Sequence, residues 1–134
     1  MVTGPYFSVD GRDVVMYAEL SNLAFHLEAI DVFQGTHDKI FAADGTILRL
    51  ATEGGKWGKV VATDEVVGTE PAQLADAIRG FLVASLNLRT KRNWFRRGLQ
   101  EQGKAGAPTL DQEGVERATL PELVDEFVRT QPSR

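Results

Sequence analysis

The sequence predicts an α+β domain built on a small antiparallel sheet. An Asp-Gly turn between two apolar runs marks residues 38–51 as a hairpin, and a strand-like stretch follows near residues 56–63. A long helical pattern then covers residues 71–87. Strands that precede a long helix, rather than alternate with helices, are typical of this class. The 134 residues, 43% hydrophobic and 25% charged, suit one ordinary globular domain.

The segment before the hairpin leaves two interpretations open. Residues 6–9 and 14–17 flank Asp10-Gly11, which predicts a first hairpin, although Asp10 would equally cap a helix. Apolar residues then recur at helical spacing at Met16, Leu20, Leu23, Leu27 and Ile30. This spacing predicts a helix over residues 16–30, with a strand as the alternative.

In residues 38–51, apolar side chains alternate on both sides of Asp44-Gly45. These two residues are expected to supply the positive φ angles of a tight turn. The strand near 56–63 carries Trp57 and two valines, and Gly68 is expected to end it.

The helix over residues 71–87 shows the clearest periodicity in the chain. Its apolar face contains Leu74, Ile78, Phe81, Leu82 and Leu88. Thr69 is expected to cap it before Pro71, and Asn87 to end it. Because an apolar helix face needs a partner, this helix should cover the sheet.

Two more helices are predicted near residues 91–102 and 119–130. Between them, residues 103–118 contain glycines beside a proline and are expected to form a flexible connection. Thr119 and Glu122 have the spacing of a capping box at the start of the last helix. We therefore expect an α+β domain over residues 1–102 and a C-terminal helix within 119–134, either docked on the body or detachable.

The charge is distributed unevenly along the chain. The formal net charge is −4, yet residues 88–97 contain five basic and no acidic side chains, so the rest of the chain is strongly acidic. The absence of cysteine fits a reducing cytoplasm, and the N-terminus lacks the pattern of a secretory signal. No apolar run approaches the ~20 residues that span a bilayer, so we expect a cytoplasmic protein without membrane contact.

The basic segment provides the candidate interaction residues, which are Arg89, Lys91, Arg92, Trp94, Arg96 and Arg97. Cationic groups beside an aromatic ring suit the phosphates and bases of a nucleic acid. Alternatively, Trp94 and its apolar neighbours anchor a helix whose arginines face solvent. We favour the second interpretation, because nucleic-acid-binding domains usually carry a basic footprint and this domain is acidic.

The sequence contains no recognisable catalytic constellation. His26 and His37 are the only histidines, and neither has a second ligand at helical spacing for a metal. The glycines and lysines of residues 54–59 lack the spacing of a phosphate-binding loop and indicate a hairpin loop instead. We therefore assign no catalytic residue, metal or cofactor, and consider an enzyme the less favoured possibility.

The resulting functional hypothesis is a non-catalytic protein-interaction domain, either an adaptor, an inhibitor or immunity-type protein, or a homo-oligomeric module. Its acidic body would meet a heterologous partner of opposite charge, or a second copy of the chain. One alternative is a nucleic-acid-associated regulator that uses residues 89–97. Another is a small enzyme or ligand-binding pocket that uses His26 or His37.

Overall fold

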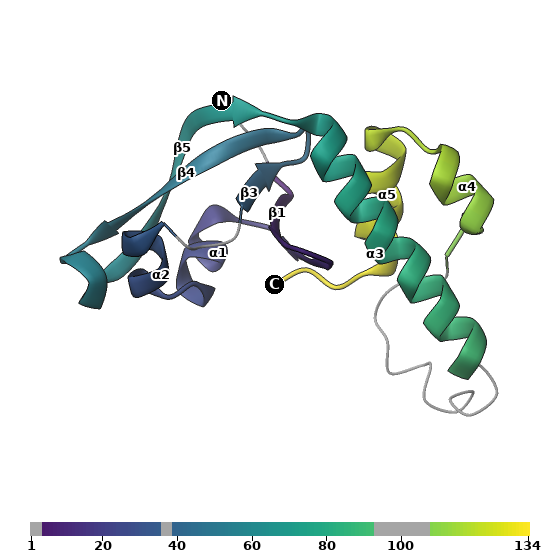
Figure 1. Cartoon of the computed structure of the whole chain (residues 1–134), viewed down its shortest axis with the longest axis horizontal. Helices are drawn as coiled ribbons and strands as arrows, with labels where there is room; N and C mark the ends of the chain where they lie inside the picture. Colours follow the sequence, from purple (N-terminus) through teal and green to yellow (C-terminus); the bar gives the residue numbers. More distant parts are fainter. Residues whose placement is uncertain (1–3, 36–38, 93–107) are drawn as a thin grey trace.

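The chain adopts an α+β fold in which helices cover both faces of an antiparallel sheet (Figure 1). This computed structural model describes residues 4–35, 39–92 and 108–134, with the backbone alone for Asp64 and residues 88–92. The five strands have the order β2-β1-β3-β4-β5, and each neighbouring pair is antiparallel. The sheet does not close into a barrel. The predicted fold class is therefore confirmed.

The N-terminal segment forms the hairpin that the sequence left open. Strands β1 (Tyr6–Asp10) and β2 (Asp13–Tyr17) meet at a turn in which Gly11 has a φ of 58°. The prediction of a helix from residue 16 is wrong at its start, because Met16 belongs to β2 and pairs with Phe7. Pairing with β1 and burial in the core decide the conformation of Met16 against its helical spacing.

The rest of the predicted helix over residues 16–30 is divided into two short helices. These are α1 (Leu20–His26) and α2 (Ala29–Gln34), and Leu27 between them has an extended backbone with φ −99° and ψ 149°. Each helix buries one side chain against the sheet, Leu23 from α1 and Val32 from α2, and Leu23 is buried completely. The apolar spacing is therefore divided between two helices with different directions.

The hairpin predicted over residues 38–51 is confirmed as β3 (Lys39–Ala42) and β4 (Thr46–Glu53). Of the two turn residues that were expected to take a positive φ, Gly45 does so, at 91°, and Asp44 does not. Asp44 instead accepts a hydrogen bond from the Thr46 N–H through Oδ1, at 3.0 Å. Any side chain at Gly45 would collide with the next helix, since a Cβ atom there would lie 2.4 Å from the Pro71 Cα.

Strand β5 (Lys59–Thr69) starts later than predicted and is longer. Residues Gly55–Trp57 form a short 3-10 helix, η1, in the loop that joins β4 to β5, as a hairpin loop was expected there. Gly68 does not end β5, because it pairs with Ile47 next to a register shift, where the ladder tolerates glycine. A second shift places residues 63–65 of β5 opposite Arg49 alone.

Helix α3 (Pro71–Arg92) confirms the helix predicted over residues 71–87 and extends it through Asn87. Thr69 is the last residue of β5 and not the cap, because the carbonyl of Glu70 accepts the first helical bond, from the Leu74 N–H at 3.2 Å. The start of the predicted helix 91–102 belongs to α3, and its remainder lies outside the described residues.

The C-terminal part contains α4 (Gln112–Arg117) and α5 (Leu120–Thr130). Helix α4 lies within the predicted flexible connection and buries Val115, so that connection contains an ordered helix. At the start of α5, Glu122 Oε1 accepts a hydrogen bond from the Thr119 N–H at 2.9 Å, as a capping box requires. Helix α5 is docked on the body, and the last residue bonds to β2 through the Arg134 N–H and the Met16 carbonyl, at 2.8 Å.

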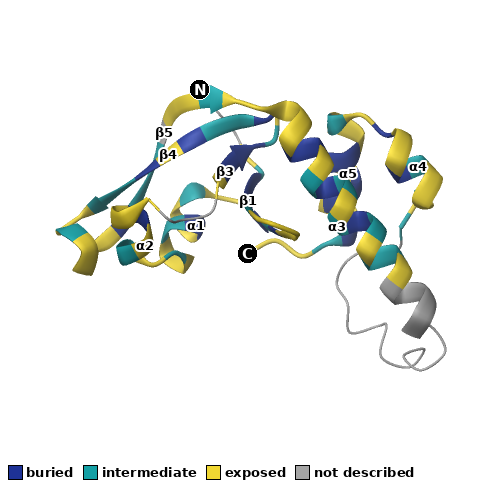
Figure 2. Cartoon of the chain, viewed as in Figure 1, coloured by how far each residue is buried: buried dark blue, intermediate teal, exposed yellow. Residues whose placement is uncertain are grey.

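The central strands are largely buried (Figure 2), and their side chains belong to two cores, one on each face of the sheet. On one face, Phe41 packs with residues of α3, α4 and α5, including Ile78 and Phe127. On the other face, Ile40 packs with Leu23 and Val32 of the two short helices. Because neighbouring residues of a strand point to opposite faces, β3 contributes to both cores, and so do β1 through Tyr6 and Phe7 and β2 through Met16 and Tyr17.

Replacing Ile78 by alanine is expected to lower the free energy of unfolding by about 2–5 kcal/mol, because this fully buried side chain would leave a cavity. Leu82→Ala should behave similarly. Asn87→Ala, at an exposed position of the same helix, should change stability by less than about 0.5 kcal/mol. Urea denaturation measures all three, and equal midpoints for Ile78→Ala and Asn87→Ala would contradict the packing of α3.

Candidate protein-interaction surface

The predicted basic segment lies at and beyond the end of α3. Arg89, Lys91 and Arg92 belong to the helix, and the structure gives the backbone of these residues. Trp94, Arg96 and Arg97 lie outside the described residues. The role of this segment in binding therefore stays a prediction.

His26 is the one described histidine, since His37 also lies outside the described ranges. It is exposed at the end of α1, and its Nδ1 lies 2.8 Å from the carbonyl oxygen of Asn22. Its ring is 5.6 Å from the rings of Tyr17 and Phe25. Among the described residues, no group of three His, Cys, Asp or Glu side chains is arranged to hold a metal ion. His26 thus caps its own helix and packs against aromatic rings.

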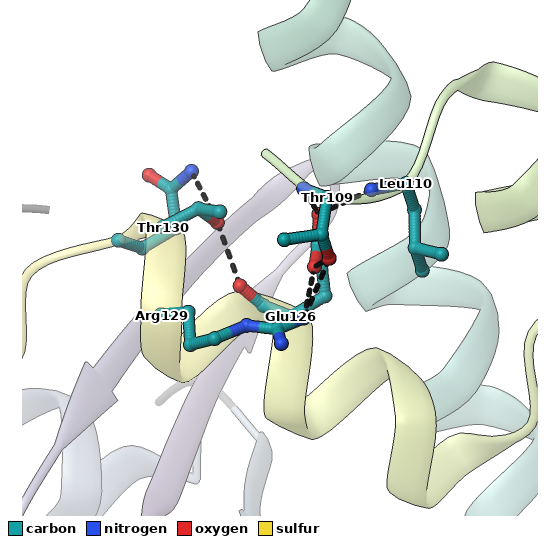
Figure 3. A network of polar contacts seen from close by, with 6 residues as sticks. Thr109, Leu110, Glu126, Arg129 and Thr130 are labelled. Carbon is teal, nitrogen blue, oxygen red and sulfur yellow. Dashed lines mark hydrogen bonds and ion pairs between the residues drawn. The ribbon is translucent and has the colours of Figure 1, made fainter. Parts of the chain in front are cut away.

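Glu126 of α5 is the buried carboxylate of the described chain, with 1% of its surface exposed. Its Oε2 accepts hydrogen bonds from the N–H groups of Thr109 and Leu110, at 2.9 and 3.0 Å (Figure 3). Its Oε1 accepts from the Thr109 hydroxyl at 2.6 Å and from Arg129. Because both oxygens are fully engaged, Glu126 fastens the segment before α4 onto α5 and leaves no lone pair directed at a substrate.

Two opposing effects set the pKa of Glu126. Burial raises the pKa, but the hydrogen bonds from Thr109, Leu110 and Arg129 favour the ionised form and together lower it below the usual range. Because the pKa is lower in the folded chain than in the unfolded one, ionised Glu126 stabilises the fold above the ordinary glutamate value of 4.5. This stabilisation is lost as the pH falls through the lowered pKa.

Glu126→Gln is expected to reduce the free energy of unfolding at neutral pH by about 1–3 kcal/mol, because an amide nitrogen would face donor N–H groups. Urea denaturation from neutral to acidic pH provides the measurement. The difference between parent and variant should shrink as the pH falls below 4.5, where Glu126 becomes protonated in the unfolded state. A difference that stays constant down to strongly acidic pH would contradict this account.

The hollow beside Glu126 offers little room for a ligand. Its free volume is about 10 Å³, close to the least that holds one water molecule, and Leu82, Leu86 and Pro108 supply apolar walls. Ligand pockets are usually larger, about 300–1,000 Å³. No described side chain has a buried nitrogen or oxygen without a hydrogen-bond partner, and no described helix is long and apolar enough to cross a membrane.

The most unusual surface feature is a set of exposed aromatic side chains. Phe25 is 85% exposed, Trp57 78% and Phe33 59%. They belong to α1, η1 and α2, and α2 contacts η1 while both helices lie against the β4–β5 hairpin (Figure 1). The three elements that carry these rings therefore lie against or within the β4–β5 hairpin, away from α3, α4 and α5 (Figure 1), and we call Phe25, Phe33 and Trp57 the aromatic end.

The local structure explains why these rings face solvent. A helix turns about 100° per residue, so Phe25 lies on the opposite side of α1 from the buried Leu23. Phe33 follows the buried Val32 and therefore lies about 100° around α2 from it, at the side of the buried face. In η1 no residue is buried, and Lys56 places its Nζ 5.4 Å from the centre of the Trp57 ring, within the range of a cation–π contact.

The helices of the aromatic end are acidic. Residues 19–35 contain Glu19, Glu28 and Asp31 and no lysine or arginine. Glu19 and Glu28 are the N-cap residues of α1 and α2, and neither side chain makes a capping hydrogen bond. N-cap positions favour Ser, Thr, Asp or Asn, whose short side chains reach the free N–H groups. Neither glutamate forms an ion pair with a described residue.

Glu28→Ser is expected to raise the free energy of unfolding by about 0.5–1 kcal/mol, because a serine hydroxyl can bond to the free N–H groups of α2. Thr119→Ala, at the N-cap of α5, should act in the opposite direction and cost about 0.5–2 kcal/mol. Thermal denaturation of the parent and both variants measures the effect. A destabilised Glu28→Ser variant would show that Glu28 supports the helix.

Comparisons with known proteins assign no family to this chain. No protein-family model matches it, and neither the curated proteins nor the solved structures contain a significant match. The function therefore has to be inferred from the geometry and charge of the chain itself.

Sequence reasoning missed the aromatic end. It placed Trp57 on a strand and did not single out Phe25 or Phe33. A signal was present, because both phenylalanines lie off the apolar spacing of Leu20, Leu23, Leu27 and Ile30. Large aromatic residues outside the apolar face of a helix are candidates for contacts beyond the domain.

Proposed function

We propose that this chain is a non-catalytic protein-interaction domain whose contact surface is the aromatic end. The observation that carries the proposal is the exposure of Phe25, Phe33 and Trp57 on three neighbouring elements. Soluble proteins rarely leave such apolar surface without a use, and aromatic residues are enriched in protein interfaces. Tryptophan in particular often carries a large share of the binding free energy.

The energetics of the rings favour binding over a structural role. Exposed as they are, the rings contribute little to folding, whereas each would gain about 1.5–3 kcal/mol when fully buried by a partner. The sheet, together with the buried Leu23 and Val32, already fixes the helices that carry two of them. The backbone of these helices therefore does not have to become ordered when a partner binds, so little binding free energy is lost.

The polar groups support the same interpretation. Glu126 is saturated by hydrogen bonds from its own chain, and one of the two ring nitrogens of His26, Nδ1, lies 2.8 Å from the Asn22 carbonyl oxygen of its own helix. A general acid or base must instead reach a substrate proton. The described chain thus offers a contact surface more readily than a reaction centre.

A triple variant, Phe25→Ser with Phe33→Ser and Trp57→Ser, is expected to abolish partner binding while keeping the fold, because all three side chains are exposed. The matched control is Val67→Ser with Val128→Ser, which removes exposed apolar side chains from β5 and α5. Each protein is used to capture partners from native cells after mild cross-linking. We expect a partner that is retained by the parent and the control and lost with the triple variant.

Equal retention by the parent and the triple variant would contradict the proposed surface, as would the absence of any specifically retained protein. The urea midpoints of the variants should differ from that of the parent only as much as surface substitutions usually allow. Loss of the partner then results from the changed surface and not from unfolding.

A further inference from the structure

The charge around the aromatic end points to a particular class of partner. We infer that this surface binds a cationic segment of a partner protein, in which lysine or arginine side chains alternate with large apolar ones. The inference rests on the proposed function and specifies its partner. It depends on the carboxylates of Glu19 and Glu28 at the starts of α1 and α2, on the exposed rings of Phe25 and Phe33 in these helices and on the position of Lys56.

The carboxylates of Glu19 and Glu28 make no hydrogen bond that holds the described fold together. Both occupy N-cap positions without capping, and neither is in an ion pair with a described residue. When a residue type is unfavourable for its position in a helix and stabilises nothing else in the fold, we expect it to contact another molecule. Here that contact is a positive charge, beside rings that would bury apolar side chains.

The same charges disfavour the other occupants of an apolar surface. In a two-fold dimer through the aromatic end, Glu19 and Glu28 of one copy would share the interface with Glu19 and Glu28 of the other. Like charges in an interface cost affinity and exclude partners. A nucleic acid or an anionic lipid surface would be repelled for the same reason.

The basic side of the surface gives the partner an orientation. Lys56 lies over the Trp57 ring, and Lys59 is paired with Glu53 at 3.5 Å. Lys56 thus places a positive charge in η1, whereas Glu19 and Glu28 place carboxylates at the starts of α1 and α2, with Arg134 bonded to Asn22 of α1 through its carbonyl oxygen. The cationic side chains of the partner would therefore lie over the two helices, where they can also stack on Phe25 and Phe33. Its apolar side chains would cover Trp57.

The test uses Trp57 as the reporter. The chain contains two tryptophans, so a Trp94→Phe variant of the full chain leaves Trp57 as the single emitter. The probes are three synthetic peptides with the same leucines and phenylalanines, in which the intervening positions are all arginine, all glutamine or all glutamate. Phosphatidylserine vesicles are the fourth probe. We expect a saturable blue shift of the emission with the arginine peptide, which weakens as salt is added.

Charge variants in the same Trp94→Phe background identify the contact. Glu19→Gln with Glu28→Gln should weaken binding of the arginine peptide by about 2- to 25-fold, as expected for two exposed ion pairs, and leave the glutamine peptide unaffected. The matched control is Glu116→Gln with Asp125→Asn, which makes the same change in net charge on α4 and α5. This control should bind the arginine peptide like the parent.

Each other outcome overturns the inference. If the three peptides bind equally well, the surface binds apolar side chains without selecting their charge. That result contradicts the cationic partner and is compatible with the proposed function. A response to the vesicles and not to the arginine peptide would identify a membrane surface as the occupant. If no probe changes the emission of Trp57, the inference of a cationic partner is wrong. The capture experiment with the triple serine variant then tests the proposed function separately.

Discussion

Burial of the central strands on both faces is the constraint on which the rest of this structure depends. Ile40 and Phe41 are adjacent in β3, both are completely buried, and they belong to different cores. A sheet of this kind needs helices on each face. The long helix α3, joined by α4 and α5, covers one face, and α1 with α2 covers the other. Loss of either layer would expose one row of apolar side chains.

The two layers differ in what they leave free. Helix α3 lies across the core with α5, where Phe127 contacts the rings of Phe7 and Phe81 at 5.4 and 5.3 Å. Glu126 adds a saturated hydrogen-bond network to this side of the molecule. The short helices on the other face bury one side chain each. Their outward surfaces therefore stay available, and with η1 they form an aromatic and acidic surface that the fold itself does not require.

The sequence predicted those parts in which local and tertiary preferences agree. The Asp44-Gly45 turn joins two strands because glycine adopts the required positive φ, and α3 forms because its apolar spacing matches the face that it buries. The capping box of α5 is equally local. Where the two preferences conflict, as at Met16, pairing with a neighbouring strand decided the conformation, and spacing alone could not show that partner.

The candidate site was the less predictable part. The sequence by itself determined the fold class, the acidic character of residues 19–35 and the presence of their two phenylalanines. Only the tertiary structure decided that Phe25, Phe33 and Trp57 are exposed on elements that lie against or within the β4–β5 hairpin and that Glu19 and Glu28 stay unpaired among the described residues. The physical reason is that exposure depends on what the rest of the chain leaves uncovered, and residues some 30 positions apart become neighbours only through the β4–β5 hairpin.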